Sequence, residues 1–171
     1  MNEPRKIIMV VDDNIANLKV AKNALSQTYD VFTVPSAAKM FDMLERNRPS
    51  LILLDIDMPE MDGFQALSAI KGDDALRNIP VIFLTARGDP ENEMKGLEMG
   101  IIDCISKPFI PQLLLKRVDL HMTAEAQEKR LEEQSAQLER QAAEIKQLAM
   151  DLRRLTEEKA IEAAKPQNAA P

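Results

Sequence analysis

The composition of this 171-residue chain changes abruptly near Phe109. All five glycines and all of the aromatic residues, five phenylalanines and one tyrosine, lie at or before that position. From Pro111 to about Lys165 there is no glycine and no internal proline, and Ala, Glu, Gln, Leu, Lys and Arg predominate. Glycine and proline oppose helix formation, whereas these residues favour it. The sequence therefore predicts one compact domain followed by one long helix.

The helix expected at the C-terminal end is far longer than a small domain can cover. Pro111 suits its first turn, and Pro166 with the polar residues QNAAP should close it. About 55 residues at 1.5 Å each would extend over roughly 80 Å. Most of this helix must therefore find another partner or stand in solvent.

The region before Pro111 alternates short apolar runs with amphipathic stretches. Strands are predicted at 6–11, 30–34, 51–54, 81–84 and 103–106. Helices are predicted at 14–27, after the N-cap residue Ser36, at 63–71 and at 90–99. Runs as apolar as LILLD and VIFLT indicate a parallel sheet that is covered on both faces. We predict an α/β fold with a five-stranded, doubly wound parallel sheet and a long C-terminal α-helix.

Polar and charged residues lie at the carboxyl ends of four predicted strands. Asp12 and Asp13 follow the first strand and Asp55 ends the third, while Thr85 ends the fourth and Lys107 follows the fifth. Open parallel sheets place their ligands at the carboxyl ends of the strands, so these five side chains should converge. Clustered carboxylates without a nearby His or Cys suit Mg2+. The pattern predicts phosphoryl transfer to Asp55, assisted by Mg2+, Lys107 and the Thr85 hydroxyl.

Four motifs in this order resemble the receiver domain of two-component response regulators: VDD at 11–13, LDIDMPEMDG at 54–63, LTA at 84–86 and SKPF at 106–109. The resemblance covers residues 5 to about 122 and implies a flavodoxin-like fold. It also implies Mg2+ held by Asp13, Asp55 and the backbone carbonyl of Asp57, with Asp12 acting through water. Asp55 would be the phosphoacceptor, Thr85 the switch hydroxyl and Lys107 the phosphate partner. The phosphodonor would be a phosphohistidine on a histidine kinase or histidine phosphotransfer protein.

The sequence departs from the family pattern at one position and leaves a second feature open. Cys104 occupies the position, three before Lys107, where the family commonly has a switch aromatic, so coupling to the surface should rely on Thr85 and the loop after it. Asp57 and Arg87 occupy two positions that tune dephosphorylation in the family, and they could pair with each other.

Two other interpretations of the function fit parts of the sequence. Asp55 and Asp57 also fit the DxD signature of haloacid-dehalogenase-type phosphatases, in which the second Asp is a general acid. In those enzymes the nucleophile strand generally comes first, whereas here Asp12 and Asp13 precede it, so we expect a signalling phosphoacceptor and no metabolic enzyme. The chain could also be a fragment of a longer regulator whose output domain is missing.

Apolar residues recur every seven positions along the predicted long helix. One row holds Leu131, Leu138, Ile145 and Leu152, and the other holds Leu113, Leu120, Leu148 and Leu155, interrupted by Gln127, Gln134 and Gln141. This spacing predicts a coiled coil, whose three glutamines would weaken its middle and limit register and partner number. A lone solvated helix is the alternative. We expect a parallel homodimer, which keeps both domains at one end.

Charge and cysteine content limit the partners and the location. The net charge of −6 gives no general attraction to nucleic acid or to an anionic membrane. Cys104 is the only cysteine, and no apolar run is long enough for a signal peptide or a membrane span. We expect a cytoplasmic protein that contacts neither DNA nor membrane directly. It would consist of a receiver domain at 1–122, a coiled-coil helix at 123–165 and a disordered tail at 166–171.

Overall fold

The structure is a computed structural model that describes residues 4–86 and 89–165. Five strands and five helices alternate along these residues. The strands are β1 (Ile7–Val11), β2 (Asp30–Val34), β3 (Leu51–Asp55), β4 (Val81–Ala86) and β5 (Asp103–Lys107). The helices are α1 (Ile15–Leu25), α2 (Ala37–Leu44), α3 (Gly63–Gly72), α4 (Pro90–Glu98) and α5 (Pro111–Ala163). The predicted tail at 166–171 and the closing role of Pro166 lie outside the described residues.

The five strands form one parallel sheet in the order β2-β1-β3-β4-β5. This order places β1 beside β3 at the centre of the sheet, and the strand order reverses there, which is the flavodoxin-like form of the doubly wound fold. The fold class predicted from the sequence is confirmed. β3, β4 and β5 each continue one or two residues past the predicted ends, because pairing with the parallel neighbour includes Asp55, Thr85, Ala86 and Lys107.

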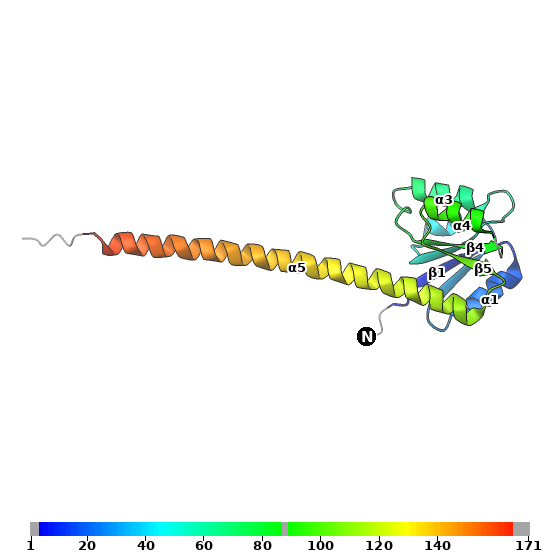
Figure 1. The fold of residues 1–171 in the computed structure, drawn as a ribbon, viewed down its shortest axis with the longest axis horizontal. Helices are drawn as coiled ribbons and strands as arrows, with labels where there is room; N and C mark the ends of the chain where they lie inside the picture. Colours follow the sequence, from blue (N-terminus) through cyan, green and yellow to red (C-terminus); the bar gives the residue numbers. More distant parts are fainter. Residues whose placement is uncertain (1–3, 87–88, 166–171) are drawn as a thin grey trace, which may run out of the picture. The chain divides into compact units, whose positions relative to one another are not determined.

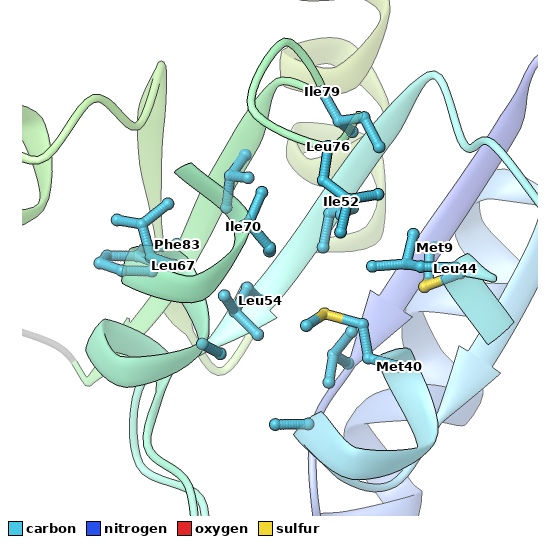
Figure 2. Packing of buried hydrophobic residues seen from close by; sticks show 14 of the residues in the cluster. Met9, Met40, Leu44, Ile52, Leu54, Leu67, Ile70, Leu76, Ile79 and Phe83 are labelled. Carbon is cyan, nitrogen blue, oxygen red and sulfur yellow. The ribbon is translucent and has the colours of Figure 1, made fainter. Parts of the chain in front are cut away.

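Two apolar clusters lie on opposite faces of the sheet. Helices α3 and α4 cover one face, and α1 and the first turns of α5 lie on the other (Figure 1). On one face, Met40 and Leu44 of α2 and Leu67 and Ile70 of α3 pack on Ile52, Leu54 and Phe83 of the strands (Figure 2). On the other face, α1 and the first turns of α5 cover residues such as Ile82 and Leu84. Burial on both faces explains why β3 is apolar at every position before Asp55, since neither face meets water.

Polar side chains begin the helices that start at the carboxyl edge of the sheet. The Asn14 side chain accepts a hydrogen bond from the backbone N–H of Ala16 at the start of α1. Asp62 and Gln65 form a reciprocal capping box at the start of α3, so Asp62 acts as a helix cap. The Ser36 side chain accepts from the Lys39 backbone N–H, as an N-cap does. These caps fix where each loop ends above the sheet.

The chain divides into two compact units, Met1–Met122 and Thr123–Pro171. In the first unit, α5 buries Leu114, Val118 and Met122 against the sheet face that α1 also covers. In the second unit, every residue described is exposed except Asp151, which is intermediate. None of the helices described is both long and apolar enough to cross a membrane.

Candidate functional site

The carboxyl ends of β1 and β3 bring three carboxylates together. Asp12 follows β1, Asp13 follows it directly, and Asp55 is the last residue of β3. One carboxylate oxygen from each of the three lies within 4.8 Å of the others. Asp12 and Asp55 are buried, while Asp13 is exposed to solvent. The predicted cluster of acidic groups is therefore formed, with one open side.

Lys107 reaches this cluster from the end of β5. Its Nζ atom lies 2.5 Å from Oδ1 of Asp55 and 3.8 Å from Oδ2 of Asp12. Its side chain retains only 20% of its exposure, so the ion pairs are partly shielded from water. The Lys107–Pro108 peptide bond is cis. One cation thus balances part of the charge of two buried carboxylates.

Thr85 lies between the strands that carry Asp55 and Lys107. Strand pairing sets Asp55 opposite Leu84, the residue before Thr85, and sets Thr85 opposite Ser106, the residue before Lys107. The Thr85 side chain is fully buried. Its hydroxyl and Oδ2 of Asp55 are buried oxygens without a hydrogen-bond partner among residues 4–86 and 89–165. Buried polar atoms are normally paired, so these two oxygens mark a position where a ligand would bond.

Asp12 is held by groups that the sequence analysis did not identify. Its Oδ1 accepts a hydrogen bond from the backbone N–H of Asn14 at 2.8 Å. The Asn17 side-chain amide donates to both of its carboxylate oxygens, at 3.2 and 3.0 Å. Asn17 lies in the first turn of α1, five residues after Asp12, and this spacing is the signal that could have identified it. These contacts orient the Asp12 carboxylate within the cluster.

The loop after β3 also contributes to the site. The backbone N–H of Asp57 points to Oδ1 of Asp55 over 3.4 Å, and the Asp57 side chain is exposed. Glu60 adopts a left-handed backbone conformation with φ of 67°. The predicted pairing of Asp57 with Arg87 cannot be followed, because Arg87 lies outside the described residues.

The electrostatics at Asp55 favour binding of a cation. Burial raises the pKa of Asp55, and the nearby Asp12 charge raises it further. The Lys107 hydrogen bond and the Asp57 backbone N–H oppose this shift but leave the pKa above its ordinary value. A second cation beside these oxygens would favour the ionised carboxylate. The all-oxygen donor set fits Mg2+ in its ligand chemistry.

The surroundings of Cys104 disfavour its thiolate form. Its thiol is half-buried on β5, and burial together with the charges of Glu93 and Asp103 raises the pKa of Cys104 to about 11.

His121 lies on α5, and its side chain is partly buried. Its Nε2 lies 3.1 Å from Oδ2 of Asp103.

The site therefore combines a buried aspartate at the end of the third strand with two further aspartates, a threonine and a lysine, on a sheet of order 2-1-3-4-5. The model of the response regulator receiver domain matches residues 8–119. The chain therefore belongs to the response regulator receiver domain family of two-component systems, as the sequence motifs predicted. The same finding favours a receiver over a haloacid-dehalogenase-type phosphatase.

Curated relatives are similar to this chain over about two thirds to three quarters of its length. A probable cyclic di-GMP phosphodiesterase of Vibrio cholerae serotype O1 is 36% identical over 126 residues, which are 74% of this chain and 28% of that protein. The response regulator PleD of Caulobacter vibrioides is 38% identical over 112 residues, which are 65% of this chain and 25% of that protein. The chain thus spans about a quarter of the length of these relatives.

Solved structures agree with this assignment. The signal receiver domain of a signal transduction histidine kinase from Syntrophus aciditrophicus is 34% identical, with a TM-score of 0.63. The match spans 70% of this chain and 91% of that domain. The chemotaxis protein CheY4 of Vibrio cholerae is 27% identical, with a TM-score of 0.64. The match spans 67% of this chain and 97% of CheY4.

Proposed function

We propose that residues 1–122 accept a phosphoryl group on Asp55 from a phosphohistidine of a histidine kinase or histidine phosphotransfer protein. The observation that carries the proposal is the buried Oδ2 of Asp55, which has no hydrogen-bond partner among the described residues while Oδ1 is held by Lys107. An oxygen that is shielded from water and has no partner keeps its lone pairs available for attack. The domain would act as a signalling phosphoacceptor, with slow self-catalysed loss of the phosphoryl group.

The transfer forms one bond and breaks one. Oδ2 of Asp55 attacks phosphorus, the bond between phosphorus and the imidazole nitrogen of the donor breaks, and the nitrogen leaves with the electron pair. Lys107 pairs with the charge that develops on the phosphoryl oxygens, and the Thr85 hydroxyl donates a hydrogen bond to one of them. Asp12, Asp13, Asp55 and the backbone carbonyl of Asp57 would hold Mg2+, which when bound neutralises phosphoryl and carboxylate charge.

Phosphorylation can be tested with a small phosphodonor. Incubation of the chain with Mg2+ and acetyl phosphate should add one phosphoryl group, detected by intact mass spectrometry as an acid-stable, base-labile species. Asp55→Asn should abolish the addition, and omission of Mg2+ should reduce it strongly. Asp42→Asn is the matched control, because Asp42 is exposed on α2 away from the site and should leave labelling unchanged.

Two results would contradict the proposal. Undiminished labelling of Asp55→Asn would remove Asp55 as the acceptor. Sustained hydrolysis of a phosphomonoester that is lost in Asp57→Ala would instead support a phosphatase in which Asp57 is a general acid.

We further propose that residues 123–165 form a parallel homodimeric coiled coil that transmits the phosphorylation state. The support is an exposed apolar row of Leu131, Leu138, Ile145 and Leu152, each 64–67% exposed. Recurrence every seven residues fits an identical helix, and the row is too narrow for burial against a whole domain. Partner helices aligned in parallel would keep both receivers at the same end. In this proposal the protein lies in the cytoplasm and contacts neither DNA nor membrane directly.

The dimer is tested by placing charges in this row. Ile145→Glu with Leu152→Glu should give monomers in sedimentation equilibrium while leaving Asp55 phosphorylation intact. Ala143→Glu with Met150→Glu is the matched control, since neither position belongs to the seven-residue rows, and it should stay dimeric. A parent chain that remains monomeric at high micromolar concentration would contradict the coiled coil, and equal dimerisation of both double variants would place the interface elsewhere.

A further inference from the structure

The two rows of the heptad differ in chemistry along helix α5. We call them the aliphatic row (Leu131, Leu138, Ile145 and Leu152) and the mixed row (Gln127, Gln134, Gln141, Leu148 and Leu155). Both rows are exposed, and the apolar members of the mixed row are 51–61% exposed. Gln134, Gln137, Leu138 and Gln141 line a shallow depression on the helix surface. The aliphatic row could pair with almost any apolar helix, but the glutamines of the mixed row restrict the choice.

We infer that Gln127, Gln134 and Gln141 set the orientation of the coiled coil, so that the helix binds a second copy of itself in parallel and rejects the antiparallel pairing. This inference rests on the proposed homodimer and names the device that determines its geometry.

In a symmetric parallel pair, each core layer brings a residue next to the same residue of the second copy. A glutamine amide carries both donors and an acceptor, so two facing glutamines can bond to each other across the seam. Three layers of this kind would form, at Gln127, Gln134 and Gln141. The layers between and after them would be purely aliphatic, so polar meets polar and apolar meets apolar throughout.

An antiparallel pair mixes the two rows, because a residue of one row then faces a residue of the other. One antiparallel alignment would pair the rows as Leu131 with Leu148, Leu138 with Gln141, Ile145 with Gln134 and Leu152 with Gln127. A shift of one heptad pairs Leu131 with Leu155 and Leu138 with Leu148, but still sets Ile145 against Gln141 and Leu152 against Gln134. Symmetry repeats each pairing, so six layers of the first alignment and four layers of the second would place a glutamine amide against an aliphatic side chain. A polar group that loses water without gaining a partner is costly, and this penalty recurs in every such layer.

The charges that flank the seam favour the opposite orientation, but only weakly. The antiparallel alignment would bring Arg130 near Asp151, whereas a parallel pair would set Arg130 beside Ser135 and Asp151 beside Thr156. Arg130 is exposed, and ion pairs at exposed positions contribute little because water and salt screen them. The four to six mismatched core layers therefore outweigh the flanking ion pairs.

Orientation can be measured in the 171-residue chain by a spin-label distance. Cys104→Ser with Glu157→Cys provides one attachment site on an exposed helical position outside both rows. A parallel dimer should give one short interchain distance, set by helix axes about 10 Å apart and the label arms. The two antiparallel alignments would separate the labels by 35 or 28 residues, or roughly 40–50 Å along the axis. A dominant long distance in a chain that sediments as a dimer would overturn the inference but keep the dimer, whereas a monomer would overturn the dimer itself.

The role of the glutamines needs a second comparison in the same labelled background. Gln134→Leu with Gln141→Leu removes most of the mismatch from the antiparallel alignment, so a second, long-distance population should appear. Gln137→Leu with Gln147→Leu makes the same chemical change outside the two rows and should retain the single short distance. A single short distance in both double variants would show that the glutamines do not set the orientation.

Discussion

Gly63 contacts the backbone at the end of β3, where Asp55 lies, more closely than a side chain would allow. A Cβ atom at this position would lie 2.5 Å from the backbone oxygen of Asp55 and 2.7 Å from Cα of Ile56. The Gly63 backbone N–H also donates to the Ile56 carbonyl at 2.8 Å. The start of α3 is therefore seated directly on the residue that carries the site.

Gly63→Ala should destabilise the receiver by about 1–3 kcal/mol, because backbone atoms would have to move. The same movement should lower the phosphorylation of Asp55. Gly72→Ala is the matched control at the other end of α3, where a Cβ would meet nothing within 4 Å, and it should be neutral or stabilising by up to about 1 kcal/mol. Urea unfolding and acetyl phosphate labelling measure both effects. Equal stability of the two variants would show that the loop relaxes around the added methyl group.

The sequence allowed some of the site to be predicted at residue scale. Asp12, Asp55 and Lys107 could be brought together because strand ends share one edge of a parallel sheet, and this requires no side-chain detail. Asn17 and the close approach of Gly63 depend on how α1 and α3 sit above the sheet, so strand and helix patterns could not predict them. The lone His121 gave no signal for its contact with Asp103, which joins residues of two different elements.

At the scale of elements, β5 and α5 are joined by a polar contact at the end of the strand opposite Lys107. Nη1 of Arg117 donates to both carboxylate oxygens of Asp103 at 2.8 Å, and His121 contacts Oδ2. Burial alone would raise the pKa of Asp103. Hydrogen bonds from Arg117, His121 and the Cys104 backbone N–H outweigh burial and lower the pKa.

Asp103→Asn should therefore reduce stability in a pH-dependent way. A lowered pKa in the folded state means that the ionised Asp103 stabilises the protein above the unfolded-state value of 3.8, and that this contribution is lost as the pH falls through the folded-state pKa. The loss should be roughly 1 kcal/mol at pH 7, since the pair is partly exposed, and should shrink below about pH 4. Urea unfolding between pH 7 and pH 3 measures it.

Asp74→Asn provides the control for this comparison. Asp74 pairs with Arg77 over 3.0 Å, but its side chain is 91% exposed, so the substitution should change stability at no pH. A constant difference between Asp103→Asn and the parent at every pH would assign the effect to packing and leave the charge without a role.

The order of strands and helices could be predicted because short apolar runs alternate with amphipathic stretches along residues 4–110, and turn residues separate them. Strand ends were harder to place, since Asp55, Thr85 and Lys107 are polar and resemble loop residues, yet pairing with neighbouring strands keeps them extended. Helix α5 was visible from composition, but only the packing of Leu114, Val118 and Met122 separates its buried turns from the rest.

At the scale of the whole molecule, the two units obtain their stability from different sources. The receiver buries two apolar clusters within one chain, whereas the described residues of the second unit leave their leucines in solvent. A helix of this kind gains little from packing on its own chain, so its stability should depend on protein concentration. Unfolding of the receiver should depend on it much less.

If phosphorylation is transmitted through the coiled coil, the dimer affinity must differ between the two states of Asp55. We expect Mg2+ and acetyl phosphate to strengthen dimerisation by at least 5-fold, the lower end of typical coupling between two sites. Because such coupling is reciprocal, the fraction of chain phosphorylated at limiting donor should rise as the protein concentration crosses the dimer dissociation constant. A chain ending at Met122 should show no such dependence, and Asp55→Asn should show no donor effect on sedimentation. Equal dimer affinity with and without the phosphoryl group would mean that the helix joins two receivers without reporting their state.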